Sequence, residues 1–256
     1  MPFFTADLHL HTVLSACAEL EMLPEFIVER AEELGLSLIA VTDHNSSENA
    51  AAMMAAAEGT EITVLPGMEV QTREEVHMVC LFDSLEQALT WQGDVYGHLP
   101  RLKNKEETFG TQIVLAPDGS PLRKNDRLLL TSTDFTVEEV VQRVRRLEGL
   151  CIPAHVDRPA YSIIANLGFI PPDLGLVGAE ISQLVGLEEA RQRFPQLMDL
   201  ALVANSDAHR LKDMVRRTTL KMERATVAEI AAALAGEGGR GVWIDGVNSG
   251  KVTSSA

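Results

Sequence analysis

Apolar runs rich in β-branched residues alternate along the chain with stretches that have a helical pattern. Strands are predicted at residues 3–10, 37–42, 62–65 together with Val70, 75–82, 150–154, 177–181 and 200–204. Helices are predicted at residues 24–35, 47–58, 85–96, 137–147 and 226–234. In the first helix, Pro24 opens the segment and Gly35 closes it. The alternation predicts an α/β fold in which helices cover a sheet of parallel strands.

The polar segment 100–133 interrupts this alternation. Residues 113–121 have the pattern of a strand that enters a tight turn, so we expect an inserted hairpin here. The loop 101–108 contains five charged residues and is expected to be a solvated surface loop. The tail 250–256 is expected to be frayed. We interpret residues 1–256 as a single domain with an insertion near 100–133.

Composition narrows the choice of partners. A hydrophobic content of 46% over 256 residues is ample for one sizeable core. The formal net charge of −15 argues against extended contact with a nucleic-acid backbone, which normally needs a basic surface. Bound divalent cations would add positive charge where a phosphate sits, so a small anionic substrate remains compatible with this charge.

The chain is predicted to be soluble and cytoplasmic, with no membrane partner. No segment approaches the roughly 20 apolar residues of a membrane span, and no basic region precedes a long apolar stretch near Met1. Cys17, Cys80 and Cys151 are odd in number and widely spaced, which favours a reducing compartment over a disulfide framework. Cys80 and Cys151 lie in predicted apolar strands and are expected to be packing residues. The oligomeric state is left open.

Histidines and carboxylates recur where apolar segments end. His9 and His11 end the first predicted strand, and residues two apart on a strand point to the same side, so both imidazoles can reach one cation. Further motifs at segment ends are Thr42-Asp43-His44, Gly67-Met68-Glu69, Val76-His77, Ala154-His155 and Ser206-Asp207-Ala208-His209. Because the C-terminal ends of parallel strands share one face, these side chains are expected to meet there. His98 lacks this placement and is expected to be a surface or helix-terminus residue.

These motifs, taken in order from residue 5 to about residue 210, resemble those of the PHP (polymerase and histidinol phosphatase) superfamily. The resemblance is specific because all the motifs occur together and in family order. It implies a distorted (β/α)7 barrel of PHP type with a cluster of two or three divalent metal ions at the strand C-termini. It also implies the hydrolysis of phosphoesters.

The resemblance further implies how the ligands are shared among the metals. One ion would be held by His9, His11, Glu69 and Asp207. Glu69 would bridge to a second ion held by His77 and His155, and a third ion would use His44 and His209. Such a cluster of zinc, manganese or iron can clamp a phosphoryl group and supply a metal-bound hydroxide as the nucleophile.

The sequence departs from the family pattern at the third site, where Cys17 follows Ala16 in place of a His or Asp. A Cys17 thiolate would tilt that site towards zinc or ferrous iron, whereas an unligated thiol would leave the third site weak or empty. Asp7 and Asp43 are interpreted as acceptors that orient ligand imidazoles, or alternatively as residues that terminate strands.

Phosphate recognition needs a cation besides the metals. Arg158, three residues after His155, is the leading candidate because its planar fork can bind phosphate oxygens bidentately. The alternative for Arg158 is a salt bridge to Asp157 or Glu180. Arg210 is a weaker candidate, and Arg73 could reach the same anion.

The leading hypothesis is a metal-dependent phosphatase that cleaves a phosphomonoester, on a nucleotide or another small phosphorylated metabolite. A second hypothesis changes the substrate to the end of a DNA or RNA strand and makes the protein a nuclease. A third is a metal-binding regulatory module without turnover. A dinuclear amidohydrolase is also conceivable, and Arg158 argues against it because an uncharged amide offers no phosphate to bind.

Overall fold

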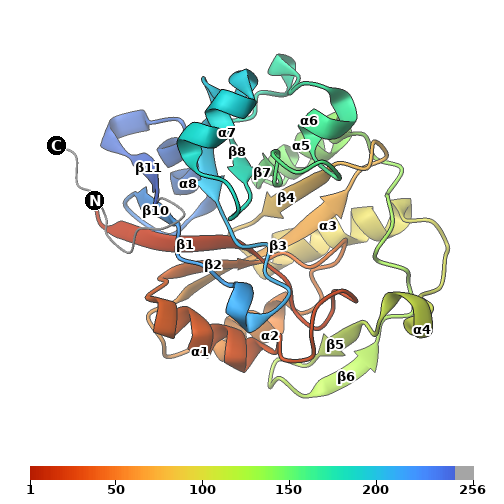
Figure 1. The fold of residues 1–256 in the computed structure, drawn as a ribbon. Coiled ribbons are helices and arrows are strands. Elements are labelled where there is room, and N and C mark those ends of the chain that lie inside the picture. Colours follow the sequence, from red (N-terminus) through yellow and green to blue (C-terminus); the bar gives the residue numbers. More distant parts are fainter. Residues whose placement is uncertain (246–256) are drawn as a thin grey trace.

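The computed structural model describes residues 1–245 (Figure 1). The strands are β1 (Phe3–Leu10), β2 (Leu38–Val41), β3 (Thr63–Gln71), β4 (His77–Leu81), β5 (Ile113–Leu115), β6 (Pro121–Lys124), β7 (Leu150–Pro153), β8 (Gly178–Ile181), β9 (Ala201–Ala204), β10 (Thr218–Lys221) and β11 (Gly241–Ile244). The helices are α1 (Pro24–Leu34), α2 (Ala50–Ala56), α3 (Leu85–His98), α4 (Glu106–Phe109), α5 (Val137–Arg146), α6 (Ile163–Leu167), α7 (Leu187–Arg193) and α8 (Val227–Leu234). The tail expected to fray, 250–256, lies outside the described residues.

Seven strands form one curled sheet in the order β11-β10-β1-β2-β3-β4-β7. β1, β2 and β3 are parallel, whereas β4 is antiparallel to both β3 and β7. The parallel pair β8 and β9 lies beyond β7, where the Val156 amide donates to the Glu180 carbonyl at 2.8 Å. On the far side of this pair, the Leu8 amide donates to the Asn205 side chain at 3.0 Å. The strands therefore curl into the distorted barrel that the sequence predicted, although not all of them are parallel.

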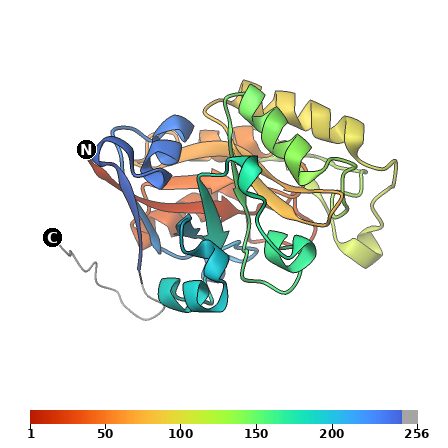
Figure 2. The ribbon, with the colours of Figure 1, turned by 90° about the horizontal axis from the view of Figure 1, so that it is seen from above.

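Helices cover the outside of this sheet, as Figures 1 and 2 show. One apolar cluster packs α1 and α2 against β1 and β2, and a second packs α3 and α5 against β3, β4 and β7. A third cluster joins α8 to side chains of β1, β2, β4, β7 and β9, and so fills space that these strands enclose. Cys80 and Cys151 are buried in the second cluster, which confirms their expected packing role.

The predicted strands and helices occur in the structure, with shifted ends. β3 is longer than the two fragments expected, because it continues through Pro66 and Gly67 as far as Gln71. The short elements α6, α7, β10 and β11 were not predicted. They have four to seven residues each, which is too few for a helical or alternating pattern to emerge.

The segment 100–133 contains the expected hairpin, in which β5 pairs antiparallel with β6. The loop expected at 101–108 is partly helical, because α4 begins at Glu106. The hairpin packs on the loops that follow β1 and β2: the Ile113 amide donates to the Val13 carbonyl at 2.9 Å, and the Leu115 amide donates to the Asn49 side chain at 2.8 Å. Within residues 1–245, no helix combines the length and apolar character needed to cross a bilayer.

Candidate metal centre

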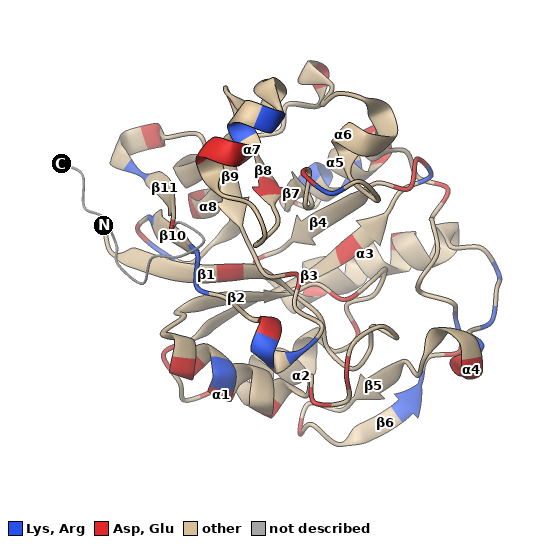
Figure 3. Cartoon of the chain, viewed as in Figure 1, with Lys and Arg blue, Asp and Glu red and all other residues tan. Residues whose placement is uncertain are grey.

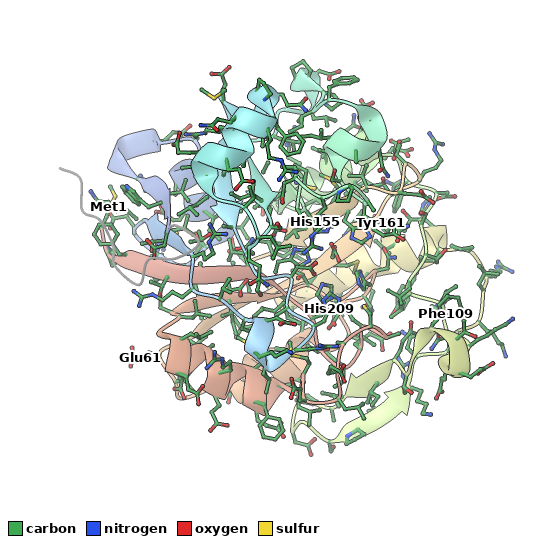
Figure 4. The ribbon with its side chains drawn as sticks, viewed as in Figure 1. Met1, Glu61, Phe109, His155, Tyr161 and His209 are labelled. Atoms are coloured by element: carbon green, nitrogen blue, oxygen red, sulfur yellow. The ribbon has the colours of Figure 1, made fainter. Side chains whose placement is uncertain are left out.

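The candidate ligands converge at one rim of the barrel, where β1, β2, β3, β7 and β9 end. His77 is the exception to the expected pattern, because it begins β4 and does not end an apolar segment. Since β4 is antiparallel to β3, its first residue lies beside the last residue of β3, and the register pairs Gln71 with His77. His77 thus reaches the same rim from the opposite chain direction. Figure 4 shows His155 and His209 near the middle of the molecule, in this region.

His9 and His11 face one another and two carboxylates. Their Nε2 atoms lie 3.2 Å apart, and His11 Nε2 lies 2.9 Å from Asp207 Oδ1. His9 Nε2 lies 3.3 Å from both Glu69 Oε1 and Asp207 Oδ1. Both imidazoles are fully buried. These four residues form one group whose ligand atoms all lie within 4.8 Å of one another.

Glu69 occupies the centre of the cluster. Its Oε1 lies 2.7 Å from His77 Nδ1 and 3.2 Å from His155 Nε2, whereas its Oε2 lies 2.8 Å from His44 Nδ1. Burial would raise the pKa of this carboxyl, but the imidazoles around it, His77 foremost, hold the pKa well below its usual range. Glu69 is therefore an anion placed to bridge two cations.

The structure groups the remaining ligands differently from the expected partition. His44 joins Glu69 and His77 in one group, and it also joins His11 and His209 in another. His155 lies outside these tight groups, although its Nε2 contacts Glu69. The side chains expected at three separate ions thus form one continuous cluster, in which His11, His44 and Glu69 are each shared.

The donor set fits divalent cations. Imidazole nitrogen and carboxylate oxygen together suit zinc, manganese or iron. Glu69 Oε2 is buried and, although it lies close to His44 Nδ1, it makes no contact with hydrogen-bond geometry among the described residues. A buried carboxylate oxygen in this position is costly, and a cation beside it would remove that cost. The residues present are therefore compatible with the metal cluster that the sequence implies.

Glu180 is a residue of this centre that the sequence did not identify as such. Its carboxylate lies 3.0 Å from His9 Nδ1, and it also accepts from the His155 amide at 3.0 Å and the Asn205 side chain at 2.7 Å. A carboxylate acceptor fixes the proton on His9 Nδ1, which leaves Nε2 free to bind a cation. The sequence feature that could have identified Glu180 is that it is the single carboxylate in the apolar segment 177–181.

Asp43 orients an imidazole indirectly. It accepts from Ser15 Oγ at 2.7 Å, and that oxygen lies 2.9 Å from His11 Nδ1 and 3.1 Å from the His44 amide. Because the single Ser15 proton goes to Asp43, His11 Nδ1 must donate to Ser15 Oγ. Ser15 therefore turns His11 Nε2 towards the cluster.

Asp7 has a different role from the one expected. It accepts from the Ser206 amide at 3.0 Å and from the Val215 amide at 3.4 Å, and it makes no hydrogen bond to an imidazole within residues 1–245. Burial raises the pKa of its carboxyl to about 6. Asp7 thus holds the backbone of the loop that carries Asp207, and the expected orientation of an imidazole by Asp7 is wrong.

Arg158 lies in the cavity that opens onto the cluster. This cavity has a volume of about 240 Å³ and is lined by His44, His77, His155, Arg158, Pro159, Ala160, Tyr161, Asp207 and His209. Arg158 Nη1 donates to Asp207 Oδ2 at 2.5 Å, so its salt-bridge partner is neither Asp157 nor Glu180. About a third of the Arg158 side chain is exposed, which leaves donors for an anion in the cavity.

The other candidate cations lie elsewhere. Arg210 Nη2 pairs with Glu19 Oε1 at 3.2 Å, and Arg210 lines a separate surface depression with Glu19 and Lys212. Arg73 is also absent from the residues that line the metal cavity, and His98 ends α3 beside Asp134, as a helix-terminus residue should. The structure thus brings only Arg158 to the candidate ligands.

Cys17 lies near His44 and His209 but does not join their ligand group. Cys17 is exposed at the surface; partial desolvation would raise the pKa of its thiol, but hydrogen bonds from His209 and His44 lower the pKa to about 6. This proximity is compatible with a thiolate ligand at the third site, which stays a prediction.

Comparison with known proteins agrees with this geometry. The model of the PHP domain family matches residues 7–242. Endonuclease Q from Pyrococcus furiosus, a lesion-specific endonuclease, has a TM-score of 0.67 and 19% identity, covering 94% of this chain and 58% of that one. An endonuclease Q complex with a 27-mer duplex containing an abasic lesion has a TM-score of 0.64, 19% identity and the same coverage of 94% and 58%. An amidohydrolase from Chromobacterium violaceum with bound sulfate has a TM-score of 0.59 and 20% identity, covering 90% of this chain and 96% of that one.

The solved structures and the family model support different statements about this chain. No curated protein sequence matches the chain. At 19–20% identity the solved structures show a shared fold, and the chain spans 58% of the length of endonuclease Q. The family match, in contrast, covers most of the chain and includes every candidate ligand. The chain therefore belongs to the PHP domain family, a family of metal-dependent hydrolases.

Proposed function

We propose that this protein hydrolyses a phosphomonoester on a nucleotide or another small phosphorylated metabolite, with divalent metal ions as cofactors. The observation that carries the proposal is the position of Arg158 beside Asp207 in the cavity over the histidine and carboxylate cluster. A guanidinium next to a cation cluster suits a substrate group with several negative oxygens. An amide offers no such group, which favours a phosphoester over an amidohydrolase substrate.

The residues of the cluster would divide the work as follows. His9, His11, Glu69 and Asp207 would hold one ion, Glu69, His44 and His77 would hold a second beside His155, and His11, His44 and His209 would hold a third near Cys17. These ions would supply Lewis-acid stabilisation of the phosphoryl oxygens and would acidify a bound water. Glu180 and Ser15 keep the imidazoles of His9 and His11 in the tautomer that points Nε2 into the cluster. Arg158 would bind a phosphoryl oxygen and keep the substrate in register.

The test is a direct assay of the reconstituted protein. Purified protein loaded with manganese or zinc should release phosphate from at least one member of a phosphomonoester panel. His9→Ala and Asp207→Ala should each lower kcat/KM by more than about 100-fold, because each removes a ligand atom from the buried group. His98→Ala removes a histidine outside the cavity and serves as the matched control.

The outcomes separate this proposal from its alternatives. A loss of less than about 100-fold in both ligand variants would contradict the mechanism. Bound metal without hydrolysis of any phosphoester would favour the third hypothesis, a metal-binding regulatory module.

A nuclease is the second candidate, and two observations favour it. Endonuclease Q, which shares the fold, is bound to a DNA duplex in one structure. The segment 100–133 also contains several basic residues in an otherwise acidic chain: Arg101, Lys103 and Lys105 precede α4, and Arg123 and Lys124 lie on β6, where they pair with Glu48 and Glu106. Figure 3 shows this blue colouring on β6 and on the loop before α4. Tight binding of single-stranded oligonucleotides that weakens steeply with salt, together with their cleavage, would favour a nuclease over a phosphatase that acts on small molecules.

A further inference from the structure

Tyr161 forms part of the cavity wall and is fixed against a candidate ligand. Its ring stacks on the His77 ring with centroids 4.6 Å apart and planes inclined by 19°. Its carbonyl accepts a hydrogen bond from the His77 amide at 2.9 Å. Tyr161 is therefore held to β4 through both its backbone and its side chain (Figure 4).

The backbone of Tyr161 is strained in this position. Its φ of 58° lies in the left-handed region, which bulky residues rarely adopt. The next residue holds the turn, because Ser162 Oγ donates to the Arg158 carbonyl at 2.9 Å and accepts from the Ala165 amide at 3.0 Å. Strain of this kind clusters at functional sites, and His155 and Asp207 in the same cavity also have positive φ, at 30° and 51°.

Nearly half of Tyr161 is exposed, although it lines the cavity. The stacked His77 ring covers one side of the Tyr161 ring, so we take the other side to be the open one. The Tyr161 hydroxyl makes no hydrogen bond to another residue in the described part of the chain, 1–245. The Tyr161 ring is held in place by His77 and is partly exposed at the cavity wall. A second ring can therefore stack on it.

The size of the cavity indicates which part of a substrate would meet the Tyr161 ring. At about 240 Å³ the cavity is smaller than the roughly 300–1,000 Å³ of most small-molecule sites. A phosphoryl group bound between the cluster and Arg158 would take up part of it and leave less room still for the leaving group. A large leaving group would therefore extend past the cavity wall, which includes Tyr161, three residues beyond Arg158.

We propose that Tyr161 determines substrate specificity by stacking its open face on the nucleobase of a nucleoside phosphate. This inference rests on the proposed phosphoester hydrolysis and narrows its substrate class. A free nucleotide and the end of a nucleic-acid strand both carry a base next to the phosphate, so the shared chemistry is a phosphate attached to a nucleoside.

The experiment compares two substrates that share the same phosphate ester, 5′-AMP and ribose 5-phosphate, which lacks the base. We expect the manganese-loaded wild type to prefer AMP by about 10-fold in kcat/KM, equivalent to about 1.4 kcal/mol. An effect of this size is typical of a base that stacks on an aromatic side chain. Tyr161→Leu should abolish the preference, and Tyr161→Phe should retain it. Phe169→Leu, which alters an exposed aromatic residue outside the cavity, is the matched control.

Two further measurements distinguish the role of Tyr161 in substrate binding from the hydrolysis reaction itself. Calorimetric binding of the same two ligands does not depend on turnover, so a wild type that binds both equally overturns the role of Tyr161 even if no hydrolysis occurs. Equal losses on both substrates in Tyr161→Leu, or loss of bound metal by elemental analysis, would mean that Tyr161 only supports His77 and would also overturn it. A 5′-phosphorylated oligonucleotide distinguishes the two sources of the base.

Discussion

At the scale of single residues, the geometry around Glu180 leads to a prediction about metal affinity. Glu180→Gln keeps the shape of the side chain but removes the negative charge that faces His9 Nδ1 at 3.0 Å. Loss of such an acceptor typically costs about 10- to 100-fold in metal affinity, because the imidazole is less basic and less firmly oriented. Competition with a fluorescent chelator measures this change directly.

The control for this experiment is Glu189→Gln, which removes a carboxylate from the exposed surface of α7. It should leave metal affinity unchanged. If Glu180→Gln bound metal as tightly as the wild type, the proposed orientation of His9 would be refuted, whatever happened to the catalytic rate.

Site residues could be recognised from the sequence where the residue type itself indicates metal binding. Histidines at the ends of apolar segments pointed to the cluster because an imidazole has few reasons to end several strands of one sheet. Glu180, Ser15 and Tyr161 could not be found this way. A glutamate, a serine or a tyrosine occurs in many surroundings, and only the fold brings these three beside His9, His11 and His77.

At the scale of elements, β3 leads to a prediction about stability. A Cβ added to Gly67 would lie 2.7 Å from the Cys80 carbonyl oxygen and 3.1 Å from a methyl carbon of Thr42, on the two neighbouring strands. Since backbone cannot move aside cheaply, Gly67→Ala should destabilise the protein by about 1–3 kcal/mol. For a chain of this size that lowers Tm by roughly 2–4 °C per kcal/mol, measured by calorimetry.

Gly93→Ala on α3 is the matched variant with the opposite expected sign. A Cβ at Gly93 meets nothing within 4 Å, and alanine is about 1 kcal/mol more favourable than glycine inside a helix. If both variants shifted Tm in the same direction, close packing of β3 between β2 and β4 would not be the cause.

The elements also show where sequence patterns stop being informative. The rhythm of strands and helices predicted the α/β fold, but it does not encode strand direction, so β4 was expected to be parallel and is not. His77 still lies in the cluster, because the first residue of an antiparallel strand lies at the same edge of the sheet as the last residue of a parallel strand. β10 pairs with β1, over 200 residues away in sequence, which no local pattern reveals, and β11 joins the sheet only through β10.

At the scale of the whole molecule, the buried cluster leads to a prediction about metal removal. Cations that bind only the folded protein stabilise it, by about 2.7 kcal/mol at a concentration 100 times Kd. We expect chelation to lower Tm by several degrees and manganese or zinc to restore it, followed by scanning calorimetry. His98→Ala should keep this response and His9→Ala should lose most of it.

An identical Tm with and without metal would count against occupancy of the cluster. The carboxylates and imidazoles would then have to satisfy one another, which is at odds with the lack of hydrogen-bond geometry at the buried Glu69 Oε2 and His155 Nδ1.

The position of β1 in the sheet has a consequence for how the molecule assembles. β1 begins the chain, yet it lies between β2 and β10, and the Leu8 amide bonds to Asn205, 197 residues away. Joining such distant segments costs loop-closure entropy and slows folding. During synthesis, His9 and His11 are made long before Asp207 and His209, and they must wait for them. The complete binding centre can therefore form only after residue 209 has emerged, so ion capture reports that these distant segments have come together.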